Sequence, residues 1–394
     1  MWPAVGEPEC GRAPARASSG LFPTAPAGRH RAHPCTPFYQ ELRPSTHAVD
    51  TACAKAMPAD FEEIQVDNMA GKQASQYTRR AHVIPASTPR HSELSVRRDL
   101  AAPLRLSVHD YHVIDADPQG ITVILTHGTS FNKHFWELII ASLLESQDVR
   151  KICKRFITFD AANHGDSALL NRGVLPTKAC WQDDSRDVLE TLKHFKVEQP
   201  VLGIGHSFGG GALCHAAMMS PGTFLSTIFV EPILFRMKAQ TEGVAQMALR
   251  RRDVWESKEA VTAAFGRSAG LRDWDAMQLQ VYIDQGTFLD YDSKVRLKTP
   301  KEQEAATYLA APHPEILNLL KQSHGRHHFV WGSESKVISS ENRESVEAIL
   351  RPPSTSQVVS GAGHLIPMTH PSGLSDILGD LIISLAGFRP KGKL

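Results

Sequence analysis

The chain has 394 residues, 42% of them hydrophobic and 22% charged, which is the length and composition of one large globular α/β domain with insertions. Its formal net charge of +1 argues against a nucleic-acid surface, and no uninterrupted apolar stretch approaches the roughly 18 residues that a membrane span requires. The six cysteines show no C-x-x-C spacing, so we predict neither a metal site nor a bound cofactor.

The N-terminal segment differs in composition from the rest of the chain. It is rich in proline, alanine and arginine and poor in acidic residues. The prolines argue against the amphipathic helix of a mitochondrial transit peptide, and no apolar core of a secretory signal follows the first residues. We predict a disordered or poorly ordered extension over 1–80, with Met57 or Met69 as alternative starts.

Strand and helix patterns alternate after this segment. Apolar and polar residues roughly alternate over 104–115, which suits an antiparallel edge hairpin. The continuous apolar run 121–126 suits a strand covered on both faces. Further patterns follow in turn: a helix over 133–145, a strand over 155–159, a helix over 181–195 and a strand over 226–230. Such alternation predicts a parallel sheet with helices on both faces.

The alternation stops between 234 and 323. This stretch is helix-rich and has no strong strand pattern. Strands resume at 328–331 and 357–360, with helices over 341–350 and 372–385. We predict an α/β fold with a mostly parallel eight-stranded sheet. Its core is formed by 81–233 and 324–394, and 234–323 is inserted late in the strand order as a helical cap, or lid.

One motif organises the core. A short apolar run ends in Gly-x-Ser-x-Gly, with Gly205, Ser207 and Gly209, and a small, apolar, helical segment follows over 212–219. A sharp turn between strand and helix holds the serine at its apex, and a Cβ at either flanking position would collide with the neighbouring strand or helix. We therefore predict that Ser207 is a nucleophile.

A serine hydroxyl needs a base to remove its proton. His364 lies on a glycine-rich loop just after the last predicted strand, which is where such a base belongs. The other late histidines lie at the wrong end of the sheet or open a helix: His324, His327, His328 and His370. We predict that His364 is the base.

Two carboxylates are candidates for the acid that orients His364. Glu231 directly follows the strand 226–230, inside an apolar stretch. Glu334 follows the later strand, but the usual Gly-x-x-Asp pattern would place its acid at 335, where this chain has Ser335. We favour Glu231 and keep Glu334 as the alternative acid.

The developing oxyanion needs hydrogen-bond donors. We predict the backbone N–H of Phe208, which follows the nucleophile, and that of Thr129, on the loop after the strand 121–126. Donors of this kind are worth about 10²–10³ in rate. His127 is predicted to shape that loop. We interpret three polar residues as scaffolding of the loop after the strand 155–159: Asn163, His164 and Asp166.

Together these motifs resemble the α/β-hydrolase fold over about residues 95 to 390. The subgroup that the chain most resembles is the fungal peroxisomal hydrolases, which include a yeast peroxisomal lipase and the AK-toxin biosynthesis hydrolases. The segments behind this resemblance are His82–Ser87, Asn163–Ser167 and Val230–Pro232. Haloalkane dehalogenases of the same superfamily also include members with a Glu acid at this strand end. Their nucleophile is Asp, so Ser207 argues against that activity.

The resemblance implies a serine hydrolase active in secondary metabolism. We expect it to cleave a carboxylic ester, either lipid-like or an acyl thioester, through an acyl-enzyme. The alternatives are acyl transfer on the same triad and a non-catalytic ligand-binding protein. Members of the subgroup end in a Ser-Lys-Leu-like peroxisomal signal. Here the last residues are Gly392, Lys393 and Leu394, so we expect a peroxisomal import receptor as partner, with the cytoplasm as the alternative location.

Overall fold

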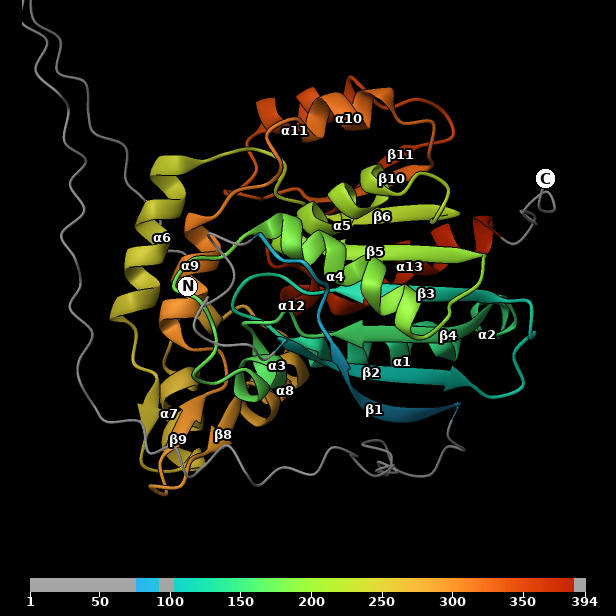
Figure 1. The fold of residues 1–394 in the computed structure, drawn as a ribbon. Helices are drawn as coiled ribbons and strands as arrows, with labels where there is room; N and C mark the ends of the chain where they lie inside the picture. Colours follow the sequence, from blue (N-terminus) through green and yellow to red (C-terminus); the bar gives the residue numbers. More distant parts are fainter. Residues whose placement is uncertain (1–75, 92–102, 386–394) are drawn as a thin grey trace, which may run out of the picture. The chain divides into compact units, whose positions relative to one another are not determined.

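The computed structural model describes residues 76–91 and 103–385, and the fold is that of these two stretches (Figure 1). Eight strands form one sheet in the order β1-β2-β4-β3-β5-β6-β10-β11. β2 is antiparallel to both of its neighbours, and the remaining pairs are parallel. The strands are β1 (Tyr77–Pro85), β2 (Arg105–Val113), β3 (Ile121–Thr126), β4 (Cys153–Phe159), β5 (Val201–His206), β6 (Ser226–Val230), β10 (His327–Gly332) and β11 (Thr355–Val359). The predicted mostly parallel eight-stranded sheet is confirmed.

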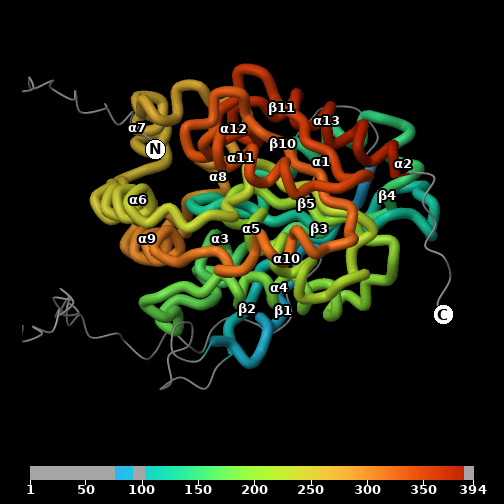
Figure 2. The backbone as a smooth tube through the Cα atoms, turned by 90° about the horizontal axis from the view of Figure 1, so that it is seen from above, coloured from blue at the N-terminus to red at the C-terminus, as the bar shows by residue number. Residues whose placement is uncertain are grey.

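Helices cover both faces of the sheet (Figure 2). On one face lie α4 (Trp181–His194), α5 (Ser207–Met219), α10 (Ile316–Gln322) and α11 (Ser340–Glu347), and on the other lie α1 (Glu137–Glu145), α2 (Gln147–Ile152) and α13 (Pro371–Ser384). Every residue of β3 and β5 is buried, as central strands covered on both faces must be. Three short helices sit in the loops: η2 (Lys133–Trp136), α3 (Gly165–Leu170) and α12 (Ile366–Thr369).

The edge of the sheet differs from the prediction. The region 104–115 forms the single strand β2 rather than a hairpin, and the edge strand beside it is β1. β1 begins at Tyr77, ahead of the predicted start of the core at 81. Its two arginines, Arg79 and Arg80, interrupt the apolar pattern, because an edge strand is only half covered. Of the predicted extension over 1–80, residues 1–75 lie outside the described residues, and 77–80 belong to β1.

An insertion between β6 and β10 forms the cap (Figure 1). Its elements are α6 (Lys238–Arg250), β7 (Val254–Trp255), α7 (Lys258–Gly266), η3 (Ala269–Leu271), α8 (Ala276–Gln285), β8 (Thr287–Leu289), β9 (Val295–Leu297) and α9 (Lys301–Leu309). The three strands pair in a small antiparallel sheet, β7-β9-β8, which the prediction of a helical cap did not include. Strands of two or three residues are too short to show an alternating pattern.

Aromatic packing joins the cap to the core. Phe131 and Phe135, from the loop after β3 and from η2, stack edge-on against Trp274 of the cap, with ring centroids 5.7 Å apart in each case. The buried Gln278 amide of α8 donates to the carbonyl oxygens of Phe135 and Pro367, at 3.1 and 3.0 Å. Within 76–91 and 103–385, no helix is long and apolar enough to cross a membrane.

Candidate active site

Ser207 stands at a strained turn between β5 and α5. Its φ is +55°, a left-handed conformation that is unfavourable for a residue with a side chain. A Cβ at Gly205 would lie 2.6 Å from Thr126 Oγ1, and a Cβ at Gly209 only 2.3 Å from the His127 carbonyl oxygen. The two glycines are therefore required by close backbone approach, as the motif predicts.

The structure brings His364 to Ser207. Its Nε2 lies 2.8 Å from Ser207 Oγ, and the residue is 8% exposed. His206 directly precedes Ser207 in the motif. Its Nε2 lies 2.9 Å from the His364 carbonyl oxygen. Burial, followed by the neighbouring His364, lowers the pKa of His206 to about 3, so its neutral ring donates to that carbonyl and holds the His364 loop. Sequence reasoning gave His206 no role.

Glu231 reaches His364. Glu231 is fully buried, and its Oε2 lies 3.0 Å from His364 Nδ1. The Gly332 N–H donates to its Oε1 at 2.8 Å, and the Ser335 hydroxyl donates to its Oε2 at 2.6 Å. The Glu334 side chain is exposed. Position 335, where the Gly-x-x-Asp pattern would place an acid, thus carries a hydroxyl that binds the acid of the neighbouring strand.

The turn that carries Thr129 runs against Ser207. A Cβ at Gly128 would lie 2.8 Å from His206 Nδ1 and 3.2 Å from Ser207 Cβ, so a larger residue there would displace His206 or the turn. Phe208 is in the first turn of α5, where backbone N–H groups lack an intrahelical partner. His127 accepts from the Ala161 N–H through Nε2, at 3.1 Å, and so ties the turn to the loop after β4.

A buried charge network lies under these two loops. Lys133 is fully buried, and its Nζ lies 2.9 Å from Asp160 Oδ2 and 2.5 Å from Asp166 Oδ2. Burial would lower the pKa of the Lys133 ammonium, but the two carboxylates outweigh burial and raise it. The cap residue Lys298 pairs with Asp166 at 2.7 Å. Asn163 and His164 also lie in this scaffold, hydrogen-bonded to each other at 2.7 Å.

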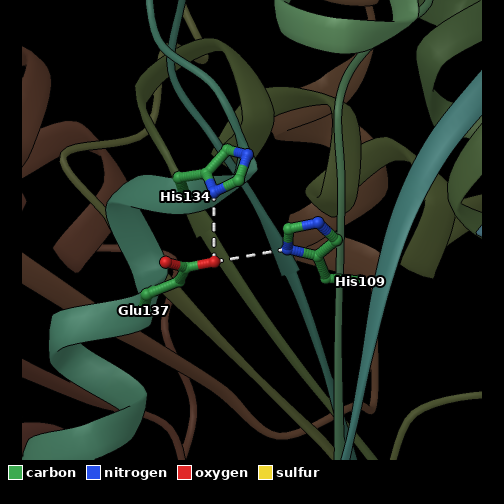
Figure 3. A group of neighbouring side chains, drawn as sticks. All are labelled: His109, His134 and Glu137. Carbon is green, nitrogen blue, oxygen red and sulfur yellow. Dashed lines mark hydrogen bonds and ion pairs between the residues drawn. The ribbon is translucent and has the colours of Figure 1, made fainter. Parts of the chain in front are cut away.

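A second histidine–carboxylate group is formed by His109, His134 and Glu137 (Figure 3). His109 Nδ1 and His134 Nδ1 lie 3.3 and 3.1 Å from Glu137 Oε1, and in the described ranges only these three residues are close enough together to hold a metal ion. The same oxygen accepts from Tyr111 at 3.0 Å and from the Arg79 guanidinium at 2.5 Å. Arg79 already supplies the positive charge, so we interpret the group as a structural ion pair.

This fold, with a serine at the turn after β5, is that of the α/β-hydrolases. Residues 123–377 match the alpha/beta hydrolase family, and the chain belongs to that family. The resemblance predicted from the motifs is thereby confirmed.

Individual relatives place the chain near fungal members. The type I acyl-CoA thioesterase mpaH from Penicillium roqueforti is 27% identical over 204 residues, which cover 48% of this chain and 46% of that protein. The abhydrolase domain-containing protein ACTT2 from Alternaria alternata is 25% identical over 227 residues, 47% of this chain and 84% of that protein. The chain spans about half the length of the thioesterase that it matches.

The solved structure of the peroxisomal α/β-hydrolase Lpx1 from Saccharomyces cerevisiae matches with a TM-score of 0.71. It is 20% identical, and the match covers 81% of this chain and 92% of that one. At this identity the likeness shows the fold.

Proposed function

We propose that the protein is a serine hydrolase that cleaves an acyl thioester or a related carboxylic ester. The observation that carries the proposal is the unbroken hydrogen-bonded series from Ser207 Oγ to His364 Nε2, and from His364 Nδ1 to Glu231, at 2.8 and 3.0 Å. The three residues occur in the chain order Ser, acid, His that this fold uses.

In this proposal Ser207 Oγ attacks the acyl carbonyl carbon while His364 Nε2 accepts the hydroxyl proton. Glu231 holds the tautomer of His364 and stabilises its imidazolium form. The N–H groups of Phe208 and Thr129 donate to the oxyanion. The leaving thiol or alcohol takes the proton from His364. Water then attacks the acyl carbon while His364 accepts its proton, and the acyl–Oγ bond breaks as His364 returns a proton to Ser207, which releases the carboxylic acid.

The similarity to an acyl-CoA thioesterase supports a thioester as substrate. A direct comparison tests it: the same acyl chain is presented as a coenzyme A thioester and as a p-nitrophenyl ester, and kcat/KM is measured for both. We expect the thioester to be preferred. A preference for the oxygen ester would assign the protein to the esterases. Added alcohol or amine acceptors, followed by product analysis, would reveal acyl transfer.

The decisive test of the chemistry is labelling with a fluorophosphonate probe. We expect rapid labelling of the wild type, none of Ser207→Ala, and slow labelling of His364→Ala. A folded wild type that is not labelled would contradict the proposal and favour the non-catalytic binding protein.

Peroxisomal location is part of the proposal and is supported by the similarity to Lpx1. The predicted signal Gly392-Lys393-Leu394 lies outside the described residues. A fluorescent protein fused upstream of the full chain is expected to enter peroxisomes and to remain outside when these three residues are removed. Equal import of both fusions would overturn the assignment of the signal.

A further inference from the structure

The turn beside the nucleophile contains a serine where glycine is usual. The Phe131 N–H donates to the Gly128 carbonyl at 3.2 Å and closes a four-residue turn, in which Ser130 has a φ of +77°. The third residue of a type II turn has φ near +80°, which favours Gly or Asn there. Ser130 therefore carries a conformational cost that glycine would avoid.

The Ser130 hydroxyl bonds to the cap both as a donor and as an acceptor. It donates to Glu304 Oε1, and it lies 2.9 Å from the Tyr308 hydroxyl, which donates to it. Glu304 and Tyr308 are four residues apart on α9 and so lie on one face of that helix. Glu304 is 3% exposed, and its other oxygen pairs with Arg251, the C-cap residue of α6. The turn is thus bonded to a cap helix that a charge pair holds in place.

The same helix is fixed independently to the neighbouring core loop. Asn163 Nδ2 donates to Thr307 Oγ1 at 2.9 Å, and Trp181 Nε1 donates to the Thr307 carbonyl at 3.0 Å. Just before the helix, the Thr299 hydroxyl accepts from the Gly165 N–H at 3.0 Å. These bonds do not involve Ser130. α9 is therefore a rigid support against which the turn can be held.

We propose that Ser130, Glu304 and Tyr308, hereafter the turn latch, position the backbone N–H of Thr129 for the oxyanion. The inference rests on the proposed function. Thr129 is adjacent to Ser130, and the turn lies against Ser207, so a small rotation of the turn moves the donor relative to the reacting carbonyl. Misplacement by about 1 Å can cost about 10²-fold in rate. The latch makes the docked cap a part of the catalytic machinery, although its side chains act only through the turn.

The test compares two variants that each remove one hydroxyl, Ser130→Ala and Tyr308→Phe. We expect kcat and the rate of fluorophosphonate labelling to fall together by about tenfold for Ser130→Ala, a part of the 10²–10³-fold effect of a lost donor, while KM changes little. Tyr308→Phe should lower both rates less, because the hydrogen bond from Ser130 to Glu304 remains. The double variant should be no slower than Ser130→Ala, since both substitutions break the same connection between the turn and α9.

A matched control loosens the cap elsewhere. Ser257 is the N-cap residue of α7, and its Oγ accepts from the Ala260 N–H at 3.3 Å. Ser257→Ala removes this cap and does not touch the turn. Wild-type labelling rates in Ser130→Ala, or equal losses in Ser257→Ala, would overturn the latch. If Ser130→Ala does not fold, Tyr308→Phe decides by the same measurement. Failure of the wild type itself to be labelled at Ser207 would refute the proposed function, and the latch with it.

Discussion

Two regions of this molecule set a histidine against a glutamate, and they differ in what balances the carboxylate charge. Glu231 is bonded by the neutral Gly332 N–H and Ser335 hydroxyl, together with His364. Glu137, 19% exposed at its side chain, is paired with the Arg79 guanidinium beside its two histidines.

The comparison sets a carboxylate held in a permanent ion pair against one that the proposed mechanism uses to orient His364. Arginine stays charged at every accessible pH, so Arg79 neutralises Glu137 permanently. Burial would raise the pKa of Glu137, but hydrogen bonds from His109 and His134 and the charge of Arg79 hold it well below its usual range. Beside Glu231, by contrast, the proposed mechanism supplies the balancing positive charge only when His364 takes the serine proton. A carboxylate placed in this way stabilises a transient charge.

The largest effect is expected at Glu231. Glu231→Gln removes the charge and presents an amide to His364 Nδ1, which favours the wrong tautomer, so kcat should fall by about 10³–10⁴-fold. Glu334→Gln is the matched control, and its exposed side chain predicts a rate within about twofold of wild type. Steady-state hydrolysis by both variants checks this. A larger loss in Glu334→Gln would make Glu334 the acid.

The next effect is on stability. Glu137→Gln leaves Arg79 without its counter-charge and should lower the free energy of unfolding at pH 7 by about 2 kcal/mol, between the values for exposed and fully buried pairs, with little change in kcat. Because the folded-state pKa of Glu137 lies below its ordinary value of 4.5, its charge stabilises the fold above pH 4.5, and this contribution is lost as the pH falls through the folded-state pKa.

Urea unfolding of wild type and Glu137→Gln at several pH values tests this window. The difference between them should be full near neutrality and should shrink below pH 4.5. A penalty that does not depend on pH would mean that packing, rather than charge, is lost in the variant.

A smaller effect is expected at Ser335. Ser335→Ala removes the hydroxyl that donates to Glu231 Oε2 at 2.6 Å. The loss of one hydrogen bond to a charged group, about 1.5 kcal/mol, predicts an approximately tenfold lower kcat. Ser345→Ala, on the exposed side of α11, is the control. Equal rates for Ser335→Ala and wild type would show that the Gly332 N–H alone orients Glu231.

No effect is expected from chelation. Because Arg79 occupies the carboxylate of the second group, incubation with EDTA should leave both the thermal midpoint and the hydrolysis rate unchanged. A drop in either value that is restored by Zn²⁺ would show that His109, His134 and Glu137 bind metal, and the contrast between the two carboxylates would then fail.

The cap shows where sequence patterns stop being informative. Its aromatic residues and helices are visible as local patterns, but β7, β8 and β9 have only two or three residues each. The turn latch joins Ser130 to residues more than 170 positions later. The charge network around Lys133 likewise joins separate loops. Contacts of this kind leave no periodic trace in the sequence.

By itself, the sequence determined the parallel sheet, the glycine-flanked turn at Ser207 and the place of His364 after the last strand. These features follow from local chemistry: side-chain periodicity and the space that glycine leaves. The sequence could rank Glu231 above Glu334 but could not separate them, since both follow strands that end at the same edge. Only the tertiary structure shows that Glu231 meets His364: β6 lies between β5 and β10, so the Glu231 carboxylate is bonded by His364 on one side and by Gly332 of β10 and Ser335 of the following turn on the other.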